Sequence, residues 1–300
     1  LAGYNKRARV MGPDASITKF VTLGYSHYRY YRQIYEYYTG KQWARIQKIV
    51  DWGCGCGRVT QFLIRSLPEN RVIGVDIDQD NILWCQENIP NGAFHVGPLY
   101  PPMQLEDCSV DYLVATSVFT HLVGETQVLW LKEIHRVLKP GAIAALTVAT
   151  DCRVAWGSFD STWIEDLEKK GINDTVVSND LAGYVDEKAY YRNVRMTKNY
   201  IRQNWKQWFE VVDICDHVFA FQDVVICRKR MESIKIEGGC RIHKGKIIGW
   251  AKVSGSEAPV SLEILTGSND LIWRGEANIY REDLKAKGIG EGRHGFACQI

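Results

Sequence analysis

Between residues 49 and 148, short apolar runs alternate with segments whose apolar residues recur at helical spacing. The runs predict buried strands at 49–52, 71–76, 93–96, 110–115 and 142–148, and two further strands are predicted at 209–214 and 219–227. A helix is predicted at 127–138, where Leu131, Ile134 and Leu138 share one face before Pro140-Gly141. Strands that alternate with helices in this way predict an α/β, Rossmann-like fold with a seven-stranded, mostly parallel sheet and helices on both faces.

Three segments lie outside this alternation, and each predicts a different kind of structure. Residues 1 to about 45 are expected to form a helical lid, in which Tyr31, Ile34 and Tyr38 share a helical face that either packs as core or covers a ligand. Residues from about 150 to 198 predict an insertion, helical at 162–170 and irregular beyond 173. Residues 231–300 alternate apolar and polar positions between glycine turns, which predicts a small antiparallel β-domain. The predicted domains are therefore 1–230 and 231–300.

The composition of the chain argues against several classes of protein. A net charge of +2 argues against nucleic-acid binding, and no apolar run reaches the length of a membrane span. No secretory signal is visible in residues 1–20, and the nine cysteines favour free thiols in a cytoplasmic protein. No set of Cys, His, Asp or Glu has ligand spacing, so we predict no metal. The chain begins with Leu rather than Met, which suggests a piece of a longer, multidomain protein.

The most informative stretch is I-V-D-W-G-C-G-C-G-R at residues 49–58, which predicts a strand, a glycine loop and the start of a helix. A dinucleotide fingerprint would place a third glycine where Arg58 stands. Asp51 precedes the loop and would repel a pyrophosphate but attract an ammonium or sulfonium. Asp76 ends the second strand, at the place of an acid that binds a ribose diol. Together these features predict a ligand with a ribose, a positive charge and a carboxylate. S-adenosylmethionine carries all three groups.

The same stretch resembles motif I of the class I S-adenosylmethionine-dependent methyltransferases. Residues 117–122, 130–133 and 136–141 are similar to later landmarks of one branch, common among bacterial enzymes near polysaccharide biosynthesis. The resemblance covers roughly residues 20 to 230. The tail resembles, more weakly, an accessory module of some glycan-pathway enzymes, in which a sugar-binding, scaffolding or packing role is open.

The resemblance implies a role for each residue of the cofactor site. Asp51 would steer the methionine end, and Asp76 would accept hydrogen bonds from the ribose hydroxyls. The N–H of Ile77 would lie beside the adenine edge. Ser117 would stand at the carboxyl end of the fourth strand, where ligands of open α/β sheets collect. The loop backbone would face the methionine end through Gly53, Cys54, Gly55 and Gly57.

His121 is the candidate catalytic base, because imidazole accepts a proton near neutral pH and this residue lies just past the fourth strand. The alternative is that His121 packs the turn before the next helix. The expected function is O-methylation of a sugar or glycan intermediate. A methyltransferase for another small molecule and a non-catalytic, cofactor-binding scaffold module remain as alternatives. A nicotinamide-dependent oxidoreductase is disfavoured by Arg58 and Asp51.

Overall fold

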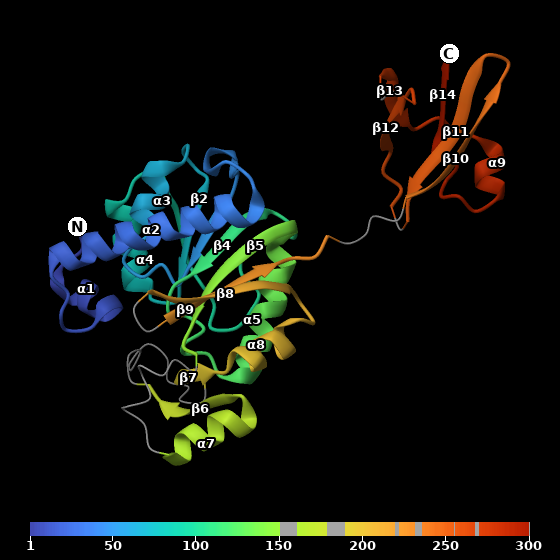
Figure 1. The fold of residues 1–300 in the computed structure, drawn as a ribbon. Coiled ribbons are helices and arrows are strands. Elements are labelled where there is room, and N and C mark those ends of the chain that lie inside the picture. The colour runs from blue at the N-terminus through green and yellow to red at the C-terminus, as the bar shows by residue number, and fades with distance from the viewer. Residues whose placement is uncertain are drawn as a thin grey trace. The chain divides into compact units, whose positions relative to one another are not determined.

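The structure is a computed structural model that describes residues 1–150, 161–178, 190–219, 222–231, 236–254, 256–267 and 270–299 (Figure 1). It divides into two compact units, Leu1–Arg230 and Met231–Ile300.

A seven-stranded sheet forms the centre of the first unit, with the strand order β3-β2-β1-β4-β5-β9-β8. The five strands at one side run parallel, whereas β9 is antiparallel to β5 and β8 is antiparallel to β9. This arrangement confirms the predicted mostly parallel sheet. The strands are β1 (Ile49–Trp52), β2 (Val72–Asp76), β3 (Ala93–Val96), β4 (Val110–Ala115), β5 (Leu138–Val148), β8 (Glu210–Phe219) and β9 (Gln222–Arg228).

Two strand boundaries differ clearly from the prediction. β5 begins at Leu138, the residue predicted to end a helix, rather than at 142. In addition, Phe219 ends β8, and β9 begins at Gln222. The two predicted strands, 209–214 and 219–227, left residues 215–218 between them. Instead, the register between β8 and β9 shifts between Cys215 and Phe219, and His217 has a φ of 52°. Such an irregularity lets a strand bend and continue where its side-chain alternation is broken.

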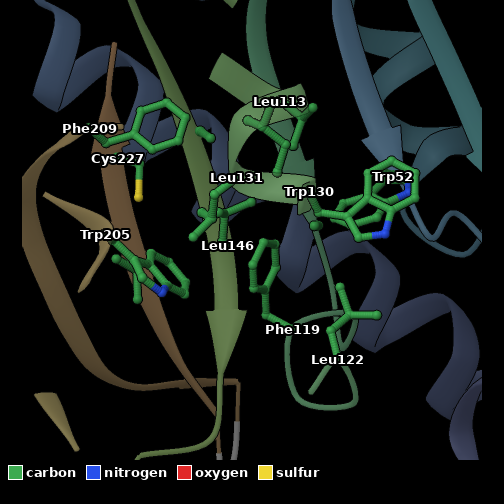
Figure 2. Close-up of a cluster of buried hydrophobic side chains, with 14 of the residues drawn as sticks. Trp52, Leu113, Phe119, Leu122, Trp130, Leu131, Leu146, Trp205, Phe209 and Cys227 are labelled. Carbon is green, nitrogen blue, oxygen red and sulfur yellow. The ribbon is translucent and has the colours of Figure 1, made fainter. Parts of the chain in front are cut away.

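Helices cover both faces of this sheet, as predicted. On one face, Val50, Leu113 and Leu146 pack against Trp130 and Leu131 of α5 (Figure 2). On the other face, strand residues such as Ile49 and Tyr112 pack against Tyr31, Ile34 and Tyr35 of α2. Successive strand residues enter opposite clusters because side chains alternate across a strand. The helices of this unit are α1 (Tyr4–Met11), α2 (Ile17–Thr39), η1 (Trp43–Arg45), α3 (Thr60–Ser66), α4 (Gln79–Asn88), α5 (Gly124–Val137), α7 (Ser161–Lys170) and α8 (Lys198–Trp205).

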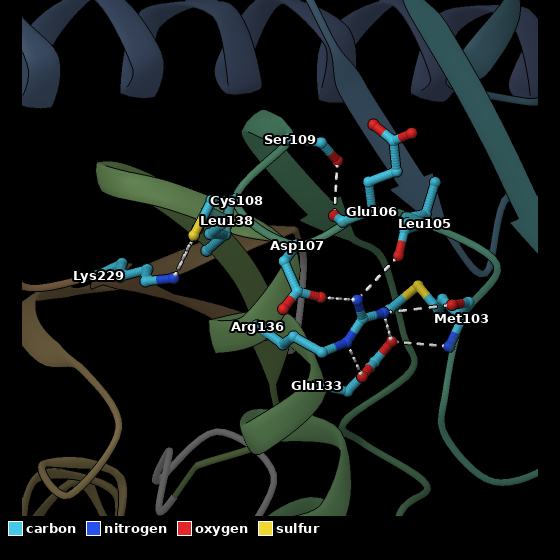
Figure 3. A network of polar contacts seen from close by, with 10 residues as sticks. All are labelled: Met103, Leu105, Glu106, Asp107, Cys108, Ser109, Glu133, Arg136, Leu138 and Lys229. Carbon is cyan, nitrogen blue, oxygen red and sulfur yellow. Dashed lines mark hydrogen bonds and ion pairs between the residues drawn. The ribbon is translucent and has the colours of Figure 1, made fainter. Parts of the chain in front are cut away.

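A polar network holds the loop before β4 against α5 (Figure 3). The Arg136 guanidinium donates to both Glu133 oxygens, at 2.9 and 2.7 Å, and to the Leu105 carbonyl at 2.9 Å. It also pairs with Asp107. The Met103 N–H donates to Glu133 at 2.7 Å, so one buried carboxylate joins the loop and the helix. The network thereby fixes the entry to β4, whose other end carries candidate site residues.

The insertion contains more regular structure than predicted. Beyond the predicted helix, β6 (Ile172–Val177) pairs antiparallel with β7 (Arg192–Met196), where we expected an irregular segment. No strand pattern is visible in these residues, because most of their side chains are not buried and apolar and polar residues therefore do not alternate. The side chain of Thr162, the residue expected to begin this helix, is not among the described side chains.

The second unit is antiparallel, as predicted. Its three-stranded sheet has the order β10-β11-β14, and β12 pairs with β13. A small core forms between them from Ala251, Ala277, Phe296 and Trp273. The elements are β10 (Ile236–His243), β11 (Lys246–Val253), β12 (Val260–Leu265), β13 (Leu271–Ala277), α9 (Glu282–Ala286) and β14 (Gly295–Gln299).

Candidate functional site

A cavity of about 510 Å³ lies at the carboxyl ends of β1, β2 and β4. Gln222 also reaches it, because β9 runs antiparallel to β5 and so begins at this edge of the sheet. Further lining residues come from α1 and from Tyr190 and Tyr191, next to β7. Ligands of open α/β sheets bind at this edge. Of the predicted site residues, those that line the cavity are Asp51, Gly53, Cys54, Gly55, Asp76, Ile77, Ser117 and His121.

The glycine loop adopts a backbone that side chains would obstruct. Gly53, Gly55 and Gly57 have φ values of 77°, 53° and 75°, in the left-handed region that favours glycine. A Cβ on Gly53 would meet Val118 at 2.4 Å, and one on Gly55 would meet Val10 at 2.5 Å. Gly57 is not among the lining residues, and its Cβ position meets Ile89 at 2.4 Å. Two of the three glycines therefore border the cavity, while the third lets the loop approach α4.

Asp51 brings a buried carboxylate to the cavity, with only 1% of the residue exposed. Its Oδ2 accepts a hydrogen bond of 2.6 Å from the Thr60 hydroxyl. Burial raises the pKa of Asp51 to about 6, against the opposing effects of the Thr60 hydrogen bond and the Arg58 charge. Asp76 raises it further. A carboxylate in this setting gains strongly from a cationic ligand, because such a ligand restores the stabilisation that burial removed.

Asp76 ends β2 and is held by main-chain donors. Its Oδ2 accepts from the Gly55 N–H at 2.7 Å, and its Oδ1 accepts from the Asp78 N–H at 2.9 Å. Burial raises the pKa of Asp76 to about 6, although both hydrogen bonds act in the opposite direction. Each carboxylate oxygen has a second lone pair, so Asp76 can still accept from ligand hydroxyls. Ile77 follows directly and also borders the cavity.

Helix α1 covers part of the cavity, where Ala8 to Gly12 contribute to the lining. Arg9 forms an ion pair with Asp78, which is itself the N-cap of α4. Lys6 Nζ donates to the Asp80 carbonyl at 2.8 Å. None of the tyrosines of α2 is among the lining residues, and Tyr31 instead donates or accepts a 2.8 Å hydrogen bond with Thr116. Within the segment expected to form a lid, α1 is thus the part beside the cavity.

Neutral polar and aromatic groups line the cavity beyond β4. Ser117 has a φ of 60°, its N–H donates to the Thr147 hydroxyl at 2.6 Å, and its Oγ lies 2.8 Å from Gln222 Nε2. The His121 ring stacks on Tyr191, with ring centroids 4.4 Å apart and planes 13° apart. A non-glycine residue with positive φ beside a cavity is a common mark of a functional position.

Several lining residues were not predicted to belong to the site, among them Arg9, Arg58 and Gln222. Gln222 is a polar residue at the start of an apolar strand, and this position in the sequence could have indicated a role in the site. The contribution of α1 had no such signal, because Arg9 and Asp78 are far apart in the sequence. No group of three or more Cys, His, Asp or Glu side chains in the described residues is arranged to hold a metal ion. Those residues also contain no helix with the length and hydropathy that crossing a bilayer requires.

One part of the first unit is similar to known proteins. Residues 49–141 match the model of a family described as "Methyltransferase domain". A trans-aconitate 2-methyltransferase of Rhodopseudomonas palustris (strain BisB18) is 29% identical over 106 residues, which are 33% of this chain and 38% of the relative. An uncharacterized methyltransferase of Schizosaccharomyces pombe is 34% identical over 109 residues, 36% of this chain and 41% of the relative. The chain thus spans about two fifths of the length of these relatives.

Among solved structures, the chain aligns with a protein of Pyrococcus horikoshii OT3. The identity is 19% and the TM-score 0.49, and the alignment covers 76% of this chain and 100% of that one. Another is a SAM-dependent methyltransferase of Methanosarcina mazei, at 19% identity and a TM-score of 0.45, covering 62% of this chain and 93% of that one. The family match agrees with the expected methyltransferase over residues 49–141, which form part of the predicted domain 1–230.

Proposed function

We propose that the chain is an S-adenosylmethionine-dependent methyltransferase. The observation that carries this proposal is the joint placement of Asp51 and Asp76, which flank the glycine loop and line one cavity. The Asp51 carboxylate can bind an ammonium or sulfonium, and the Asp76 carboxylate can bind a ribose diol. The cavity volume of about 510 Å³ lies in the range of small-molecule and cofactor sites. The match of residues 49–141 to a methyltransferase domain supports the same conclusion.

Each cofactor-site residue has a part in this proposal. Asp51 steers the methionine end, and the backbone of Gly53 to Gly55, including Cys54, borders it. Asp76 accepts from the ribose hydroxyls, with its orientation set by the Gly55 and Asp78 N–H groups. Ile77 places its N–H beside the adenine edge. Ser117 borders the reacting end, while Gly57 keeps the loop close to α4. The cofactor supplies a methyl group already activated on a sulfonium, so the protein mainly positions and orients the acceptor.

For the acceptor, we propose a hydroxyl of a sugar or glycan intermediate. The neutral polar groups beyond β4 support this class, because Ser117 and Gln222 can exchange hydrogen bonds with hydroxyls. His121 then acts as the base. As the acceptor oxygen bonds to the methyl carbon and the carbon–sulfur bond breaks, the imidazole takes the hydroxyl proton. Stacking on Tyr191 fixes the plane of the ring for this transfer.

Two further parts of the proposal concern the rest of the protein. We propose that Met231–Ile300 is an accessory module of the glycan pathway, for which its antiparallel β-structure is suitable. We also propose a cytoplasmic location, which the free thiols of the described cysteines support.

The first experiment is calorimetric titration of the purified chain with S-adenosylmethionine, with NAD as the control. We expect saturable binding of the former and none of the latter; the reverse pattern, or no binding of either, overturns the proposal. Mass spectrometry then scores methyl gain on a panel of nucleotide sugars and on trans-aconitate, the acid in the name of one relative. Methyl transfer to a nucleotide sugar supports a sugar hydroxyl as the acceptor. Transfer only to trans-aconitate would overturn this acceptor class in favour of a carboxylic acid.

A further inference from the structure

Arg58 places a positive charge at the cavity, directly after the glycine loop. Protein surrounds its guanidinium on most sides, and burial, the largest influence, lowers its pKa. Asp51 and Tyr31 act in the opposite direction. Within the described residues, however, the guanidinium makes no hydrogen bond or ion pair that meets ordinary distance criteria. Arg58 is therefore a largely enclosed cation that faces the cavity without a direct partner among these residues.

An anionic ligand would stabilise a cation in this position. A guanidinium has five N–H donors and no acceptor, and it stays protonated in proteins. Enclosing it without a carboxylate partner is unfavourable, because the lost hydration is not replaced. Asp51, the acid whose charge acts on Arg58, accepts its hydrogen bond from the Thr60 hydroxyl at 2.6 Å instead. The free site thus keeps its donors available to an anion that enters the cavity.

We propose that Arg58 binds the carboxylate of the amino-acid end of S-adenosylmethionine while Asp51 binds the ammonium of the same end. This inference rests on the proposed function. The two residues carry opposite charges on the same part of the cavity wall, and each influences the other electrostatically. A guanidinium can hold a carboxylate through two parallel hydrogen bonds, which a lysine cannot reproduce. The pair therefore recognises a zwitterion rather than an isolated charge.

The test compares S-adenosylmethionine with its decarboxylated analogue, which keeps the adenosine, the sulfonium and the amine. Calorimetry on the wild-type chain should give about 10- to 100-fold weaker binding of the analogue, the loss expected for a charge-assisted hydrogen-bonding partner. In Arg58→Gln, S-adenosylmethionine should weaken by a similar factor and the two ligands should bind almost equally. Arg58→Lys should fall between the two. Arg65→Gln, an exposed arginine on α3 that does not line the large cavity, is the matched control and should behave as wild type.

A purely structural arginine predicts different results. If Arg58 only held the fold together, Arg58→Gln would lower the melting temperature of the ligand-free chain. We expect that temperature to stay level or rise, while the shift on adding S-adenosylmethionine shrinks. Unchanged discrimination between the two ligands in Arg58→Gln would overturn the inference and leave the proposed function standing. A wild-type chain that binds neither ligand would overturn both.

Discussion

Asp51 gives a prediction that separates stability from ligand binding. Because the carboxyl is buried, its ionisation works against folding: a pKa raised from 3.8 to about 6 corresponds to about 3 kcal/mol, at about 1.36 kcal/mol per pKa unit. The folded state holds its proton more tightly than the unfolded state, so this contribution favours the fold below pH 3.8 and is lost as the pH rises through about 6. Asp51→Asn removes the ionisation and keeps an oxygen that can accept from Thr60.

We therefore expect the unfolding free energy of Asp51→Asn, relative to that of wild type, to rise by up to about 3 kcal/mol as the pH increases from acid to mildly alkaline. At about pH 5 roughly half of this difference should have developed. Urea unfolding of the ligand-free chains across this range measures it, with the exposed Glu87→Gln as a control that should show no such trend. Binding of S-adenosylmethionine should weaken about tenfold or more, by loss of the charged partner. A difference between the two chains that does not change with pH would refute the reasoning.

Three other substitutions test separate parts of the site. Asp76→Ala should weaken S-adenosylmethionine binding about tenfold or more; calorimetry showing wild-type affinity would remove the ribose assignment. His121→Gln should lower kcat for the acceptor and leave the cofactor Kd unchanged, and unchanged kcat in the transfer assay would reject the catalytic role. Gly53→Ala should cost about 1–3 kcal/mol in urea unfolding, because φ is 77° and the new Cβ meets Val118 at 2.4 Å. Gly3→Ala, with open space around it, is the control and should stay near wild type.

Local patterns in the sequence were enough to predict the sheet and the glycine loop. The strand at 49–52 and the loop after it follow from neighbouring residues, and so does the acid that ends β2. What the sequence could not show depends on distant pairs. The ion pair of Arg9 with Asp78 seats α1 beside the cavity, and the contact of Ser117 with Gln222 joins residues more than a hundred positions apart. The β6–β7 pair escaped prediction because its side chains are mostly not buried.

The two ends of the cavity are built from different parts of the polypeptide, and this has a consequence for evolution and redesign. At Asp76, the N–H groups of positions 55 and 78 orient the carboxylate, and the backbone that presents the first of them leaves little room for any residue other than glycine at position 55. Beyond β4, the surface includes the side chains of His121, Tyr191 and Gln222, each of which a single codon change can replace. Descendants of this chain can therefore acquire new acceptors by substitution at that end while inheriting an unaltered ribose site.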